Sequence, residues 1–150
     1  MNILLDTLPE TVEVEGRDFF IDTDFRTFII MEKIMLDRSM GSREQFDNII
    51  GLFYTDEVPQ NMVKAMHAVL DIYRCGLDNK GRTSVRKNGN VELRPRMIYD
   101  YVIDAPYIYG AFLAQYGIDL NEIDYLHWWK FQALFRSLNS CHKIVEIMSY

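Results

Sequence analysis

The side chains with the widest chemical range in this sequence are its histidines, cysteines and clustered carboxylates. His67, His127 and His142 could each bind a metal or carry a proton, but none lies in an HExxH or HxH pattern or beside a carboxylate at ligand spacing. We therefore expect no metal site. We expect His127, which precedes two tryptophans, to be a core residue whose ring bonds a backbone carbonyl.

The cysteines and the carboxylates also favour structural roles. Cys75 and Cys141 lie far apart without a CxxC pattern, so in a reducing compartment we expect small core residues rather than a disulfide or ligands. Asp119, Glu122 and Asp124 cluster where we expect a helix to begin, and a helix dipole favours acids there. No GxSxG, GxxxxGK[ST] or GxGxxG motif is present. We expect neither an enzyme nor a bound cofactor.

Two adjacent tryptophans indicate recognition rather than catalysis. Neighbours on a helix project about 100° apart, so Trp128 and Trp129 cannot both face one core direction. The hairpin or the last helix could cover the second ring, or that ring could belong to a docking or self-association surface. We expect Trp128 in the core and Trp129 exposed as the contact. The predicted partner-binding residues are Trp129, Trp128, Tyr125 and Tyr107.

Residues 104–138 hold nine of the twenty aromatic residues and should form the centre of the core. Asp104 and Pro106 are typical of a helix start, and Gly117 is typical of a left-handed residue that ends a helix. Asp119 is then expected to open a second helix, whose apolar positions cover more than half of its circumference.

The rest of the chain predicts a hairpin and further helices. Thr23 or Asp24 should cap the first helix, Ser42 with Gln45 forms a capping-box pair, and Pro59 should begin a third helix. Asn139 or Ser140 should cap the last one. The expected fold is mainly α, a compact single domain over 1–150 with an N-terminal β-hairpin at 11–21 and about six helices, at 24–38, 43–54, 59–75, 105–116, 120–138 and 141–149.

A basic segment interrupts the helical pattern at 76–97. It has glycine, asparagine and serine but no helical stripe, so we expect a mobile loop, with a small hairpin closed at Asn88-Gly89 as the alternative. It lacks stacking aromatics, which favours a solvated linker or an electrostatic contact with an acidic partner over a nucleic-acid site. Its basic residues are Lys80, Arg82, Arg86, Lys87, Arg94 and Arg96.

Composition sets the class of protein. The 150 residues are 49% hydrophobic and 25% charged, as in one soluble globular domain with a sizeable core. The net charge of −6 argues against a general nucleic-acid binder. No apolar run approaches the roughly 18 residues of a membrane helix, and the opening residues lack the pattern of a signal peptide. We expect a cytosolic protein that binds neither nucleic acid nor a membrane.

Several short runs resemble one phage family. They are Ile98-Tyr99-Asp100-Tyr101, Tyr109-Gly110-Ala111-Phe112-Leu113, Tyr116-Gly117-Ile118-Asp119-Leu120 and Tyr125-Leu126-His127-Trp128-Trp129-Lys130-Phe131, with Leu8-Pro9-Glu10-Thr11-Val12 and Thr23-Asp24-Phe25-Arg26 near the start. The chain is similar over most of its length to a family from long-tailed phages and prophages of Gram-positive bacteria. Pro106-Tyr107 replaces a more polar pair.

The resemblance implies a role in tail assembly. Genes of this family typically precede the tape-measure gene, and the family is treated as a tail assembly chaperone or a tail structural protein. The expected function is to bind the tape-measure protein and keep it soluble during tail morphogenesis in the host bacterial cytoplasm. Other tail proteins and further copies of this chain are expected as partners. The alternatives are a structural component of the virion and a small enzyme.

Overall fold

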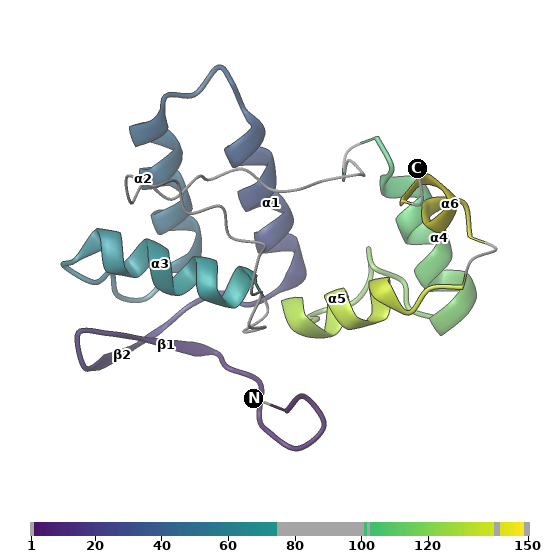
Figure 1. Cartoon of the computed structure of the whole chain (residues 1–150), viewed down its shortest axis with the longest axis horizontal. Helices are drawn as coiled ribbons and strands as arrows, with labels where there is room; N and C mark the ends of the chain where they lie inside the picture. Colours follow the sequence, from purple (N-terminus) through teal and green to yellow (C-terminus); the bar gives the residue numbers. More distant parts are fainter. Residues whose placement is uncertain (1, 75–100, 102, 140–141, 149–150) are drawn as a thin grey trace, which may run out of the picture. The chain divides into compact units, whose positions relative to one another are not determined.

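The computed structural model describes residues 2–74, 101, 103–139 and 142–148. These residues form a two-stranded hairpin and six helices, which confirms the predicted mainly α fold with an N-terminal hairpin (Figure 1). The chain divides into two compact units, Met1–Pro95 and Arg96–Tyr150, and each is described by itself. The expectation of a single domain stays a prediction. The elements are β1 (Thr11–Val14), β2 (Arg17–Phe20), α1 (Phe25–Leu36), α2 (Ser42–Phe53), α3 (Met62–Tyr73), α4 (Ala105–Tyr116), α5 (Trp128–Arg136) and α6 (Lys143–Met148).

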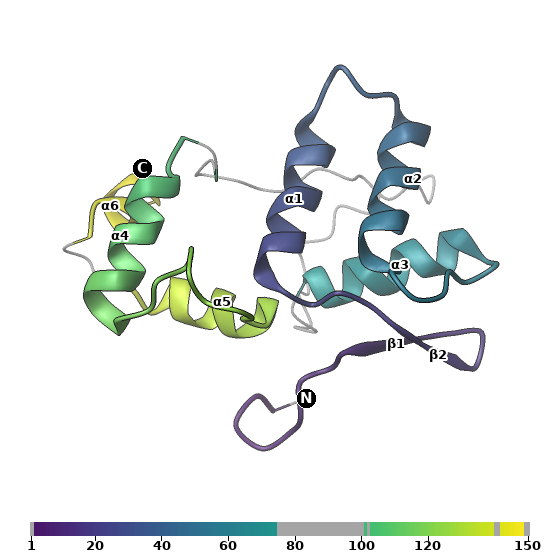
Figure 2. The same ribbon diagram turned by 180° about the vertical axis from the view of Figure 1, so that it is seen from behind.

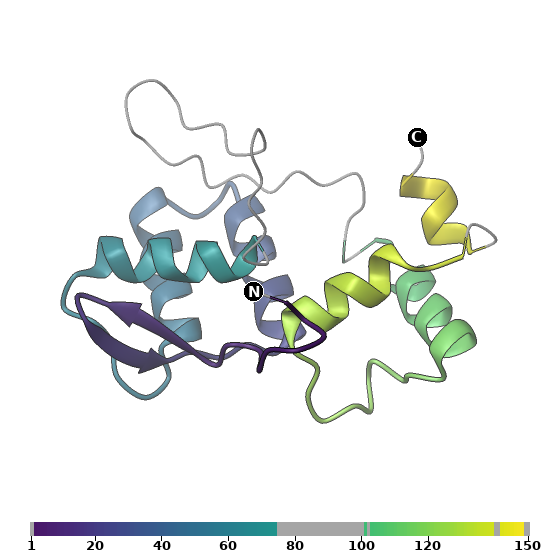
Figure 3. The same ribbon diagram turned by 60° about the horizontal axis from the view of Figure 1, so that its bottom comes forward.

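The hairpin turns at two residues with positive φ. Glu15 (φ 52°) and Gly16 (φ 78°) connect the antiparallel strands, in which Val12 pairs with Phe19. Positive φ at both central residues is the geometry that matches the twist of the flanking strands. Val12, Val14 and Phe19 are buried, and β1 packs against α3 (Figure 3). The hairpin therefore covers one side of α3, as an isolated pair of strands requires.

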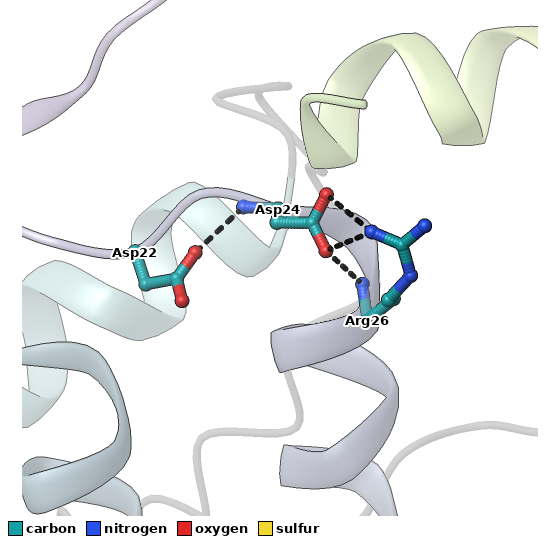
Figure 4. Close-up of polar contacts among 3 residues, drawn as sticks. All are labelled: Asp22, Asp24 and Arg26. Atoms are coloured by element: carbon teal, nitrogen blue, oxygen red, sulfur yellow. Dashed lines mark hydrogen bonds and ion pairs between the residues drawn. The ribbon is translucent and has the colours of Figure 1, made fainter. Parts of the chain in front are cut away.

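Asp24, one of the two predicted caps, caps α1. Its Oδ2 accepts a hydrogen bond from the Arg26 amide at 3.2 Å, and Arg26 Nη1 lies 3.2 Å from the same oxygen (Figure 4). Asp22 Oδ1 accepts from the Asp24 amide at 3.1 Å, which holds the cap in place. The arrangement satisfies an amide at the helix start that would otherwise have no partner.

The predicted capping box at the start of α2 is wrong. Gly41 occupies the cap position without a side-chain bond, and Ser42 is already the first helical residue. The side chain of Gln45 points elsewhere: its Nε2 donates to the carbonyls of Ile34 at 2.9 Å and Asp37 at 3.0 Å. Gln45 therefore adds a side-chain donor to carbonyls at the end of α1, where the helix itself supplies few amides.

Helix α3 begins later than Pro59, where the sequence predicted its start. Asn61 is the cap, and its Oδ1 accepts from the Lys64 amide at 3.1 Å. The Asn61 Nδ2 also donates to Glu15 Oε1 at 3.0 Å, so the same side chain links α3 to the hairpin turn. Asn61 makes both contacts and so determines the helix start more strongly than Pro59. A proline is compatible with a first turn but makes no capping hydrogen bond.

In unit 1, α1 and α2 lie side by side and α3 crosses near one end of them (Figures 1 and 2). Phe28 and Phe53 pack with ring centroids 4.7 Å apart, and both are fully buried. Tyr54 donates its hydroxyl to the Ala65 carbonyl at 2.7 Å. Burial raises the pKa of Tyr54 to about 12, so this hydroxyl remains a donor at any ordinary pH.

Unit 2 is built around Phe131, which is fully buried. Its ring packs on those of Phe112 (centroids 5.2 Å apart), Trp128 (5.6 Å) and Phe135 (5.8 Å). Such ring pairs add to the free energy gained by burying their apolar area. Residues 104–138 supply these rings, and the expectation that they form the centre of the whole chain's core stays a prediction.

The predicted helix 120–138 is shorter than expected. Asp119 caps a single turn, in which its Oδ1 accepts from the amides of Asn121 at 3.0 Å and Glu122 at 3.2 Å. Helix α5 starts only at Trp128. The acidic cluster therefore belongs to this turn and not to the first turn of α5.

Helix α4 ends as predicted. Gly117 has φ 67°, and its amide donates to the Leu113 carbonyl at 3.0 Å. At the other end, Asp104 occupies the cap position, but its side chain makes no capping hydrogen bond, contrary to expectation. Pro106 lies in the first turn, where its missing N–H has no cost.

Some predictions fall outside the described residues. They are the basic loop 76–97 with its six cationic residues, the two cysteines and a cap at Ser140. Within the part of the chain that the structure describes, no helix has the length and apolar character needed to cross a membrane.

We predict that Phe131→Ala lowers the free energy of unfolding by about 3–5 kcal/mol, because it removes a buried ring and leaves a cavity. Denaturant unfolding followed by circular dichroism measures this loss. The control is Leu113→Ala on the exposed side of α4, which should cost less than about 1 kcal/mol. Equal midpoints for the two variants would contradict the central position of Phe131.

Candidate binding surface

Helix α4 has no charged residue in its twelve positions. Ile108, Ala111 and Phe112 are buried on its inner side. Tyr107 and Leu113 keep 46% and 44% of their surface exposed on the outer side. A helix that is apolar all round is normally buried all round, so the exposed side of α4 departs from the common pattern.

One flank of α4 is fixed by Tyr109. Its hydroxyl donates to Asp119 Oδ2 at 2.8 Å, which ties the helix to the turn that follows it. This hydrogen bond, with those from two backbone amides, lowers the pKa of Asp119. The same bond is the main cause that raises the pKa of Tyr109. Both effects favour the pairing of a neutral phenol with an ionised carboxylate at neutral pH.

The other flank of α4 is fixed by Gln115 and Tyr116. Gln115 Nε2 donates to the Ser137 carbonyl at 2.9 Å, and its Oε1 accepts from the Asn139 amide at 2.7 Å. Tyr116 donates its hydroxyl to the Leu134 carbonyl at 2.5 Å. These bonds join α4 to the end of α5. The rotation of α4 about its axis is thereby set, because both flanks and the inner side are engaged.

The remaining side of α4 carries the residues that define what we call the α4 face: Tyr107, Gly110, Leu113 and Ala114. All four are exposed, and Tyr107, Leu113 and Ala114 each lie three or four positions from Gly110, so they share one side of the helix. A Cβ added at Gly110 would meet no atom within 4 Å. The α4 face therefore has a low centre at Gly110, with Tyr107 and Leu113 beside it along the helix.

The tryptophans do not lie as predicted. Trp128 is buried in the core, as expected, but Trp129 is also buried, with 8% of its surface exposed. The expectation of an exposed Trp129 is wrong: the two rings have different neighbours, Phe131 for Trp128 and His127 for Trp129, and both are buried. Of the four predicted partner-binding residues, Tyr107 and Tyr125 are exposed, each at 46%.

His127 caps α5. Its Nδ1 accepts a hydrogen bond from the Trp129 amide at 3.0 Å, and the two rings meet edge to face at 5.5 Å between centroids. The histidine is buried, as expected, and the expected bond from its ring to a backbone carbonyl stays a prediction. An accepting Nδ1 carries no proton, so a neutral ring holds its proton on Nε2.

The other residues with possible chemistry are dispersed. His67 is exposed on α3, and His142 Nε2 lies 3.0 Å from Gln115 Oε1. Glu122 and Asp124 are exposed near the Asp119 turn. In the ranges that the structure covers, no group of three or more histidine, cysteine, aspartate or glutamate side chains is arranged to hold a metal ion.

The sequence reasoning missed two features. It did not identify the α4 face, although twelve helical positions without a charge are visible in the sequence. It also overlooked Glu32, a buried carboxylate on α1. Glu32 lies four positions after Phe28 and so falls within the apolar stripe of that helix, which was the available signal.

These observations define a mainly α protein whose most unusual surface is an exposed, uncharged helix side. Residues 4–150 match the family model described as Bacteriophage Gp15 protein, and the chain belongs to this family. It is therefore a phage protein, which agrees with the phage family that the sequence resembles. No curated protein and no solved structure matches the chain.

We predict that His127→Ala destabilises the protein by about 1 kcal/mol or more, because the Trp129 amide loses its acceptor. His127→Asn should recover part of this loss, since asparagine is also a good cap. Thermal or denaturant unfolding measures both. If His127→Asn were no more stable than His127→Ala, the cap would not be the reason for the histidine.

Proposed function

We propose that this protein is a phage tail assembly chaperone that binds the tape-measure protein and keeps it soluble during tail morphogenesis in the host bacterial cytoplasm. Membership of the Gp15 family supports a phage role. The observation that carries the finer proposal is the α4 face, an exposed apolar surface on a helix held in place by its neighbours.

The α4 face suits an amphipathic helix as its ligand. Side chains of such a ligand would pack beside Tyr107 and Leu113, and Gly110 between them would admit a close approach. Tape-measure proteins are long and helical, so they present apolar faces that aggregate when uncovered. A chaperone that shields such faces needs an apolar surface of this kind, which is fixed before binding and costs little ordering entropy.

The absence of charged residues on α4 predicts how binding responds to salt. Because α4 has no charged residue, its contacts depend on apolar burial and should persist at ionic strengths that screen charged pairs. Self-association, which we also propose, would place several α4 faces along one long ligand and raise the avidity without a new contact. Release would follow when tail-tube subunits compete for the same helices.

We predict that co-expression with the tape-measure protein moves that protein from the insoluble to the soluble fraction, and that the two co-purify. Gly110→Gln should weaken this effect, because it fills the centre of the α4 face. The control is Gly51→Gln on α2: it is also an exposed helical glycine with open space around its Cβ. Glutamine has a higher helix propensity than glycine, so neither variant should lose stability.

The outcomes separate the proposal from its alternative. Tape-measure solubility that is the same with and without this protein would contradict the chaperone role. Abundant copies of this protein in purified virions would favour a structural role instead, since a chaperone leaves the finished particle. Equal loss of co-purification in both glycine variants would remove α4 from the proposed contact while leaving the chaperone role to be decided by solubility.

A further inference from the structure

Glu32 on α1 is a buried acid with one unsatisfied oxygen. It keeps 4% of its surface exposed. Its Oε1 accepts a hydrogen bond from the Tyr73 hydroxyl at 2.7 Å, whereas its Oε2 has no hydrogen-bond partner among the residues that the structure describes. A buried carboxylate with an unpaired oxygen is costly, because the charge has lost its water without full compensation. Such a group at a helix contact needs a physical explanation.

Tyr73 makes Glu32 part of a joint between two helices. It is the last residue of α3, and its ring stacks on Phe28 of α1 with centroids 6.4 Å apart and an interplanar angle of 14°. Phe28 and Glu32 are one helical turn apart on α1. Tyr73 therefore joins the end of α3 to α1 both through its ring and through its hydroxyl.

The surrounding charges do not compensate Glu32. Lys33 beside it is exposed, and Arg74 at the end of α3 lies 3.9 Å from Asp71 of its own helix. The charged residues of α2, which packs on α1, are all exposed: Arg43, Glu44 and Asp47. Among the described residues, Tyr73 is thus the titratable group bonded to Glu32.

We propose that Glu32 and Tyr73 form a protonation-sensitive latch, in which the neutral carboxyl holds the end of α3 on α1 and the ionised carboxylate releases it to admit water. Loss of the proton leaves a buried charge, and local opening is the way to hydrate Oε2 while the rest of unit 1 stays folded. Burial raises the pKa of Glu32 to about 7, against a smaller lowering by the Tyr73 hydrogen bond. The latch would therefore respond near neutral pH.

The direction of the pH effect follows from this shift. Below pH 4.5 the carboxyl is neutral in the folded and the unfolded chain, so the full contribution to stability is present. As the pH rises through about 7, the folded state also loses its proton and the contribution disappears. The folding equilibrium constant should fall by a factor on the order of 100 across this range through Glu32 alone.

The test uses three full-length proteins, the wild type and two variants. Urea midpoints at pH 5 and pH 8.5 are compared for the wild type, Glu32→Gln and the exposed control Glu44→Gln. The midpoints of the wild type and Glu44→Gln should fall more with rising pH than that of Glu32→Gln. Hydrogen exchange should show the wild type losing protection at Leu70–Tyr73, relative to Glu32→Gln, at the higher pH only. The same pH response in all of these proteins would overturn the latch.

Tyr73→Phe keeps the proposal testable if Glu32→Gln does not fold. This variant retains the ring that stacks on Phe28 and removes the hydroxyl that favours ionisation. The carboxyl carbon of Glu32, followed by nuclear magnetic resonance, should titrate near neutral pH in the wild type and at higher pH in Tyr73→Phe. Titration below pH 5 in the wild type, or no change on loss of the hydroxyl, would contradict the latch.

Discussion

Every helix that the structure describes has twelve residues or fewer, and this length is the constraint on which the fold depends. Helices this short are marginal in water, because too few internal hydrogen bonds compensate for nucleation. Each must therefore bury a face and find partners for its free end groups. Asp24, Asn61 and His127 bond amides at helix starts, while Gln45 and Gln115 bond carbonyls at helix ends. The two glutamines come from neighbouring helices, so each one connects two helices while it donates a hydrogen bond to a backbone carbonyl.

The sequence predicted the helices well where apolar spacing and punctuation agreed. Asp24 marked the start of α1, within which Phe28, Met31 and Met35 are spaced as on one helix face, and Gly117 marked the end of α4. It failed where one side chain had two possible tasks. Gln45 fits a capping box by spacing, but the carbonyls of α1 are only brought near it by the tertiary fold. Asp119 was correctly recognised as a cap, yet nothing local indicates that a single turn follows it in place of a helix.

The candidate surface was only partly predictable for a related reason. Trp128 and Trp129, the first two residues of α5, do have different ring neighbours, but divergence does not require exposure: Trp129 meets the ring of His127, the residue that caps the helix. Tyr107 was correctly chosen as exposed, whereas Gly110 has no side chain to attract notice. The α4 face and Glu32 are opposite departures from one rule, an apolar surface left in water and an acid kept out of it. The α4 face and Glu32 could each be recognised only once the burial of the individual residues was known.

The position of the tryptophans also has a spectroscopic consequence. Both lie in unit 2, while the aromatic residues of unit 1 are phenylalanines and tyrosines. Indole fluorescence excited beyond the tyrosine band therefore reports on one unit alone, without a label. Comparing it with backbone ellipticity in a single titration reveals whether the units unfold in one step or in two. The intrinsic tryptophan fluorescence of the chain can therefore show how many cooperative units it has.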